Sequence, residues 1–155
     1  MRLAEIMSRD VQTVRESERA ELVWQKMQEK GIRHMVVTEN REVVGVITDR
    51  DLGGKRGRRM RAERLVRDLM TRNPITVGPR TTVRQAANRM RHRIVGSLIV
   101  AEDGKMRGIV TMSDLLDLIG RGLEVPTRTK ERRTGRRPGA AREALSGAAA
   151  KRRAR

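Results

Sequence analysis

The sequence predicts an α+β fold in which a β-α-β-β-α unit occurs twice. Two observations predict it: an internal repeat without gaps, and the same order of helical and strand patterns in both copies. Shifting the 155-residue chain by 63 positions places residues 6–52 on residues 69–115, with 11 of 47 positions identical. Such a period indicates two copies of one supersecondary unit. Each copy is too small to enclose a core alone, so we expect the copies to pack against each other with pseudo-two-fold symmetry.

Each copy is expected to begin with a short strand and an amphipathic helix. The strands are predicted at residues 11–14 and 75–77. Apolar residues then recur at the i, i+3, i+4 and i+7 positions of a helix. Ser17, and Thr81 or Thr82, occupy positions typical of N-caps. The apolar stripe consists of Ala20, Val23, Trp24 and Met27 in the first copy, and of Val83, Ala86, Ala87 and Met90 in the second.

Each copy is expected to continue with a hairpin and to end with a helix. Polar turns that favour hairpins join the two strands of each copy. A closing helix is predicted over residues 113–119, whereas Gly53 and Gly54 shorten its counterpart in the first copy. The hairpin strands are predicted at residues 35–38 and 43–48, and at 98–101 and 108–111.

Composition excludes several classes of protein. There is no Cys, which excludes disulfide scaffolds, thiol catalysis and Cys-ligated zinc. Two His residues are too few for a His-rich metal site, and nucleophile-elbow and phosphate-loop motifs are missing, so we expect no metal and no catalytic residue. No apolar run approaches the roughly 20 residues that span a bilayer. With no secretory signal evident, a cytoplasmic protein without membrane contact is expected.

The positive charge is concentrated in two segments. The chain carries 36 Lys and Arg against 19 Asp and Glu, with six basic residues in 53–64 and twelve in 121–155. We therefore divide the sequence into a first repeat with a basic linker (3–60), a second repeat (66–120) and a basic tail. The tail is poor in large apolar residues and is expected to be disordered. A solvated linker is the simplest interpretation of residues 53–64; contact with a cleft edge or a polyanion is the alternative.

A Gly-x-x-Thr-x-x-Asp motif ends the last strand of both copies. It comprises Gly45, Thr48 and Asp51, and again Gly108, Thr111 and Asp114. One interpretation is a capping box, in which Thr is the N-cap and Asp lies three positions on. The other is a ligand site, because a helix start after a strand favours an anion and a first-turn carboxylate can accept both ribose hydroxyls. The two interpretations are compatible, and the duplication favours the second.

The doubled motif and the repeat openings resemble a tandem CBS-domain pair, also called a Bateman module. The openings are Ile6-Met7-Ser8 and the segment from Leu69 to Val77, and the resemblance covers about residues 3–120. It implies two pseudo-symmetric clefts that bind AMP, ADP, ATP or S-adenosylmethionine. It also implies homodimers and a regulatory role such as energy sensing, with no cofactor beyond the regulatory ligand.

The resemblance assigns sugar and base contacts to matching positions. Asp51 and Asp114 match the ribose-binding carboxylates, and Thr48 and Thr111 match hydroxyls that face ribose or phosphate. The positions that frame or contact adenine are Thr13, Thr76, Val46 and Ile109.

Phosphate contacts are expected to differ between the copies. Arg33 and His34 precede a strand where the family often places basic phosphate ligands, and Arg50 lies inside the first motif. The second copy has Gly96 and Ser97 at the positions of Arg33 and His34, so we expect two unequal sites.

A second interpretation makes the basic tail the working part of the protein. Its cations would bind nucleic acid through counterion release, or an acidic partner protein, with the repeats acting as a dimerisation scaffold. Base readout is not expected, because the tail has no aromatic residues and no recognition helix.

Overall fold

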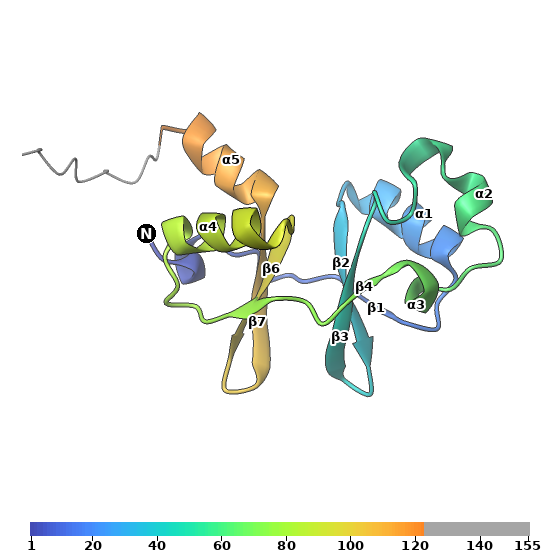
Figure 1. Cartoon of the computed structure of the whole chain (residues 1–155), viewed down its shortest axis with the longest axis horizontal. Helices are drawn as coiled ribbons and strands as arrows, with labels where there is room; N and C mark the ends of the chain where they lie inside the picture. Colours follow the sequence, from blue (N-terminus) through green and yellow to red (C-terminus); the bar gives the residue numbers. More distant parts are fainter. Residues whose placement is uncertain (123–155) are drawn as a thin grey trace, which may run out of the picture. The chain divides into compact units, whose positions relative to one another are not determined.

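The computed structural model describes residues 1–122, which form two sheets with helices packed on them (Figure 1). The predicted β-α-β-β order is present twice; a closing helix follows directly in the second half, whereas turns and two short helices follow in the first. The elements of the first half are η1 (Leu3–Glu5), β1 (Thr13–Arg15), α1 (Ala20–Lys30), β2 (His34–Glu39), β3 (Glu42–Thr48), η2 (Gly54–Arg56) and α2 (Arg58–Arg61). The elements of the second half are α3 (Val66–Leu69), β4 (Thr71–Arg72), β5 (Thr76–Val77), α4 (Val83–Arg93), β6 (Ser97–Glu102), β7 (Lys105–Thr111) and α5 (Met112–Gly120).

The two sheets share one pairing scheme. The strand orders are β1-β2-β3-β4 and β5-β6-β7. The first two strands of each order are parallel, and the next pair forms an antiparallel hairpin. Both hairpins turn through two residues of positive φ, which are Asn40 and Arg41 in the first and Asp103 and Gly104 in the second. Such turns match the twist of the strands they join, so the predicted hairpins are confirmed.

The helix starts agree with the predicted N-caps in the second repeat but not in the first. Thr82 caps α4, and its side chain accepts a hydrogen bond from the N–H of Gln85. The assignment of Ser17 as a cap is wrong, since Arg19 precedes α1 and makes no side-chain cap. The N–H of Ala20 instead donates to the carbonyl oxygen of Arg64, 2.9 Å away. A distant segment thus satisfies the helix start that the sequence assigned to a local side chain.

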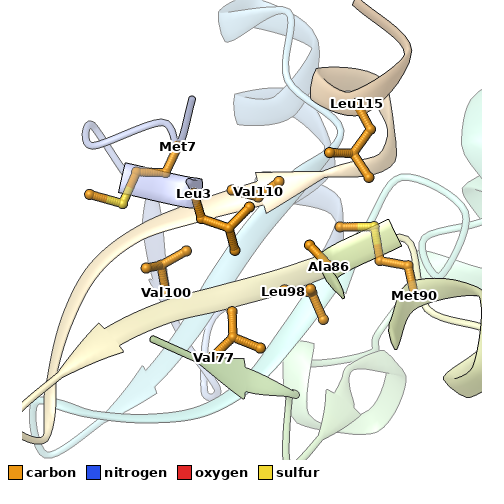
Figure 2. Close-up of a cluster of buried hydrophobic side chains, with 9 residues drawn as sticks. All are labelled: Leu3, Met7, Val77, Ala86, Met90, Leu98, Val100, Val110 and Leu115. Carbon is orange, nitrogen blue, oxygen red and sulfur yellow. The ribbon is translucent and has the colours of Figure 1, made fainter. Parts of the chain in front are cut away.

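The N-terminal segment completes the core of the second repeat. Leu3 and Met7 belong to one cluster of buried side chains with residues of β5, α4, β6, β7 and α5. Figure 2 shows Leu3 beside Val110 within this cluster. Backbone hydrogen bonds also attach this segment to the second repeat. The N–H of Leu3 donates to the carbonyl of Thr81, and the N–H of Ser8 donates to the carbonyl of Ile109.

The segment between the repeats completes the first core in the same way. Val66 is fully buried with residues of β1, α1, β2 and β3, and Leu69 and Met70 pack against that cluster. The N–H of Val66 donates to the carbonyl of Glu18 at 2.9 Å. Each half therefore takes its opening segment from the sequence of the other repeat.

A third apolar cluster joins the two sheets. It contains Val36 of β2, Val46 of β3, Ile99 of β6 and Ile109 of β7, all nearly inaccessible to solvent. These residues hold equivalent positions in the two copies, so the cluster follows the repeat symmetry. The expectation that the copies pack against each other is confirmed.

The repeated glycines of the Gly-x-x-Thr-x-x-Asp motif make room for the N-terminal segment and for the segment between the repeats. A Cβ on Gly45 would lie 2.8 Å from the carbonyl oxygen of Thr71, and one on Gly108 would lie 2.8 Å from that of Ser8. Backbone atoms occupy both places, and they cannot move aside as a flexible side chain does. The two glycines thus allow the backbone of the opening segments to lie directly against β3 and β7.

The basic segment 53–64 is more than a solvated linker. It contains η2 and α2, and Arg61 is 2% exposed. The guanidinium of Arg61 contacts Glu21 and stacks on the ring of Trp24. The remaining basic residues of the segment are exposed.

The predicted disorder of the tail lies outside the described residues, as does a frayed helix predicted over 140–153. Within residues 1–122, no helix combines the length and the hydropathy that a bilayer crossing requires.

We predict that Gly45→Ala and Gly108→Ala each lower the free energy of unfolding by about 1–3 kcal/mol, the usual cost of forcing atoms into a packed site. Urea denaturation measures the change. Gly78→Ala is the matched control, because a Cβ on Gly78 meets no atom within 4 Å. A loss at Gly78 equal to that at Gly108 would contradict the steric explanation.

Candidate functional site

A cavity of about 800 Å³ lies between elements of the two repeats. Its walls come from the ends of β2 and β3, the turn after β3, and the connection from β4 to β5. The C-terminal end of α4 and the first turns of α5 complete it. Both repeats therefore contribute residues to one hollow large enough for a small molecule.

The first Thr–Asp pair is held rigidly at one wall of this cavity. The N–H and the hydroxyl of Thr48 both donate to Oδ2 of Asp51, each at 2.8 Å. The N–H of Asp51 donates back to Oγ1 of Thr48 at 3.1 Å. Within the described residues Oδ1 of Asp51 accepts no hydrogen bond. One oxygen thus fixes the carboxylate and the other is free for a ligand.

The second pair has the same geometry at the start of α5. Oδ2 of Asp114 accepts from the N–H and the hydroxyl of Thr111, at 2.6 and 2.8 Å. The two repeats differ downstream of the threonine, because a nine-residue helix begins at Met112, whereas residues 49–53 form turns before the short helix η2. Both pairs make the hydrogen bonds of a capping box, but only Thr111 is the N-cap of a helix, because turns follow Thr48.

Four arginines line the cavity, two from each repeat. Arg33 and Arg50 were predicted as phosphate contacts, and Arg91 and Arg93 join them from the end of α4. None of the four forms an ion pair within residues 1–122, and all are exposed. Arg91 and Arg93 were not among the predicted site residues, because the local sequence does not show which part of the other repeat faces the end of α4.

Apolar side chains form another part of the wall. Val46, Ile75 and Val95 are buried or half-buried, and Leu116 lies further out. Ile94 is 94% exposed and has a φ of 54°, where its counterpart in the first repeat is Gly31. A β-branched residue in this left-handed region is strained. Ile94 thus places an exposed apolar side chain at the edge of the cavity.

His34 lies where the two repeats meet. A Cβ on Gly96 would be 3.5 Å from its Nε2, an ordinary contact distance, so the imidazole lies close to the backbone of the second repeat. Burial lowers the pKa of His34 below its ordinary value, although the carboxylates of Asp49, Asp51 and Asp114 act to raise it. Neutral His34 can donate or accept a hydrogen bond at neutral pH.

The structure brings six of the eleven predicted site residues to this cavity and leaves five elsewhere. Thr13 and Thr76 are exposed on β1 and β5 and do not line the cavity. The six that line it are Arg33, His34, Val46, Thr48, Arg50 and Asp51. The other three that do not are Ile109, Thr111 and Asp114.

The connection from β4 to β5 was missed by sequence reasoning. Asn73, Pro74 and Ile75 line the cavity directly before the predicted Thr76. Thr76, the predicted adenine contact, thus lies one residue beyond the part of this segment that lines the cavity. No group of three or more potential metal ligands occurs in residues 1–122.

The family model of the CBS domain matches residues 3–52 and 66–121 of this chain. The chain belongs to the CBS domain family. The two matches correspond to the two repeats, and the resemblance seen in the sequence is confirmed. CBS domain pairs are regulatory modules, and a CBS domain is not itself catalytic.

Curated relatives match this chain over part of their own length. An inosine-5′-monophosphate dehydrogenase of Korarchaeum cryptofilum is 37% identical over 69% of this chain and 22% of its own length. An uncharacterized protein of Methanopyrus kandleri is 38% identical over 75% of this chain and 61% of its own length. The chain thus spans less than two thirds of either relative.

Solved structures share the fold over nearly their full length. An uncharacterized conserved protein of Pyrococcus horikoshii is 27% identical, with a TM-score of 0.68 over 80% of this chain and 96% of its own. A CBS domain pair crystallised with 5′-methylthioadenosine and S-adenosyl-L-methionine is 22% identical, with a TM-score of 0.70 over 79% and 98% of the two chains.

We predict that His34 makes stability depend on acid pH. Because the folded chain holds this imidazole with a lowered pKa, the unfolded chain takes up the proton first as the pH falls. The free energy of unfolding should therefore decrease as the pH drops below the ordinary value of 6.5. Urea denaturation at pH 7.5 and 5.5 should show a smaller decrease for His34→Gln than for the wild type. His92→Gln, at an exposed position, should leave the wild-type decrease unchanged.

Proposed function

We propose that this CBS pair is a regulatory module that binds an adenosine-containing ligand in the cavity described above. The observation that carries the proposal is the Asp51 carboxylate, whose Oδ2 is fixed by Thr48 while Oδ1 remains free at the cavity wall. A rigid carboxylate with a free oxygen suits the two adjacent hydroxyls of a ribose. The methylthioadenosine and S-adenosylmethionine bound by a protein of the same fold support this ligand class.

The surrounding side chains fit the rest of such a ligand. Val46, Ile75 and Val95 offer apolar contact to an adenine ring, and Ser113 offers a hydroxyl. The four cavity arginines would pair with phosphate oxygens through charge-assisted hydrogen bonds. They favour AMP, ADP or ATP over S-adenosylmethionine, whose sulfonium is itself a cation.

A second, weaker site at Asp114 belongs to the same proposal. Thr111 and Ile109 repeat the arrangement of Thr48 and Val46, but Gly96 replaces Arg33. Fewer cations there predict weaker retention of phosphates. The predicted roles of Thr13 and Thr76 at adenine find less support, because both side chains lie outside the cavity.

The signal would pass through the relative positions of the two repeats or of two subunits. A ligand shifts such an equilibrium only by its difference in affinity for the two states. The cavity is built from both repeats, so a bound ligand would touch both and favour one arrangement. A homodimer is supported by α5, where Met112, Leu116 and Ile119 are 49%, 61% and 59% exposed.

We predict that Asp51→Asn weakens binding of AMP or ATP by about 10- to 100-fold, since hydrogen bonds to a charged group are worth about 1.5–3 kcal/mol. The amide oxygen can still accept from Thr48, so the fold should persist. Titration calorimetry with AMP, ATP and S-adenosylmethionine measures the change. Asp117→Asn, an exposed carboxylate on α5 outside the cavity, is the control. Unchanged affinity of the Asp51 variant for all three compounds would refute the site.

We predict that Leu116→Glu converts a homodimer into monomers, because a charge in the apolar patch of α5 loses its hydration on association. Sedimentation velocity across protein concentrations measures the change. Leu22→Glu is the matched control, since Leu22 is 50% exposed on α1 of the first repeat. A wild type that is monomeric at all concentrations would refute the dimer.

A further inference from the structure

The segment 53–64 between the repeats is anchored by a buried arginine. Nε of Arg61 donates to Oε2 of Glu21 at 2.7 Å, and Nη1 donates to the carbonyl oxygens of Leu52 and Gly54 at 2.8 and 2.6 Å. The guanidinium carbon lies 4.1 Å from the centroid of the Trp24 ring. Trp24 in turn packs against the first core. The segment is therefore attached to the folded body by its own cation.

The other cations of this segment point to solvent without counter-charges. They form no ion pair within the described residues, and Glu63 is the one acidic residue of the segment. We call this set the insert surface; it consists of Lys55, Arg56, Arg58, Arg59 and Arg64, all exposed. A buried arginine thus anchors a segment that carries five exposed cations without an ion pair in residues 1–122.

We propose that the insert surface binds the phosphate backbone of a nucleic-acid duplex. An ordered set of unpaired cations on an exposed turn matches a regular array of phosphates, which carries about one charge per 1.7 Å of duplex axis. No residue of 53–64 lines the cavity, so the surface is separate from the adenosine site.

The chemistry of the surface favours nucleic acid over an acidic protein. Stable protein interfaces depend on apolar or aromatic side chains buried at their centre. No large apolar side chain of the segment 53–64 is exposed. The single aromatic residue of the chain, Trp24, lies under Arg61, so base stacking contributes nothing and binding follows the backbone without sequence preference.

The test compares two triple variants of the full-length chain that remove the same charge. Lys55→Gln, Arg58→Gln and Arg59→Gln together change the insert surface. Arg80→Gln, Arg84→Gln and Arg89→Gln change exposed arginines of the second repeat. Fluorescence anisotropy with a short labelled duplex of mixed sequence, as DNA and as RNA, is measured across salt concentrations.

The expected result is a clear difference between the triples. The insert variant should bind more weakly, with a slope of log K against log salt less steep by roughly 2 to 3, or about 0.9 per lost phosphate contact. The control variant should retain the wild-type slope. Equal slopes in both triples would overturn the proposal, since charge anywhere on the chain, including the tail, would then explain binding. No measurable binding by the wild type would also overturn it.

Two further measurements test whether binding requires the Arg61 anchor and whether the partner is a nucleic acid. Arg61→Lys keeps the net charge but loses the forked donor set, so duplex binding should weaken at least severalfold while the circular dichroism spectrum is retained. Wild-type affinity in this variant would show that the buried anchor is irrelevant to binding. Competition with poly-glutamate of equal total charge should displace the duplex poorly, and displacement as effective as that by unlabelled duplex would identify an acidic protein as the partner instead.

Discussion

The exchange of opening segments is the constraint on which the rest of the structure depends. Leu3 and Met7 fill the second core, and Val66 and Met70 fill the first. Neither repeat can bury its apolar face with its own consecutive residues. The exchange also fixes the two sheets relative to each other, because each half holds a chain segment that leads directly into the other. The cavity between them is a consequence of this arrangement.

The Thr–Asp pairs show how one local motif serves stability and binding together. In each pair one carboxylate oxygen completes a capping box, and this interaction keeps the side chain in a single orientation. A carboxylate held in this way loses little conformational entropy when it accepts a ligand hydroxyl. The same pairs differ in surroundings, since Arg33 stands beside one copy and Gly96 beside the other. The two repeats therefore share the hydrogen bonds of the Thr–Asp pair but differ in the charge beside it.

The sequence predicted what depends on local pattern and missed what depends on contacts between distant segments. The repeat, the hairpins and the caps at Thr82 and Thr111 are consequences of spacing and turn chemistry, and all are observed. Ser17 was misassigned because the carbonyl of Arg64, distant in sequence, satisfies that helix start. The cavity arginines of α4 and the burial of Arg61 were likewise missed, because a charged residue carries no local sign of the partner that it meets after folding.

The exchange of segments also sets an order of events during synthesis on the ribosome. The first core can close soon after Met70 emerges, since all its members then exist. Leu3 and Met7 are made long before Val110 and Leu115, and they have no core to pack in until those residues have been added. A chain truncated within the second repeat therefore leaves apolar side chains without a core.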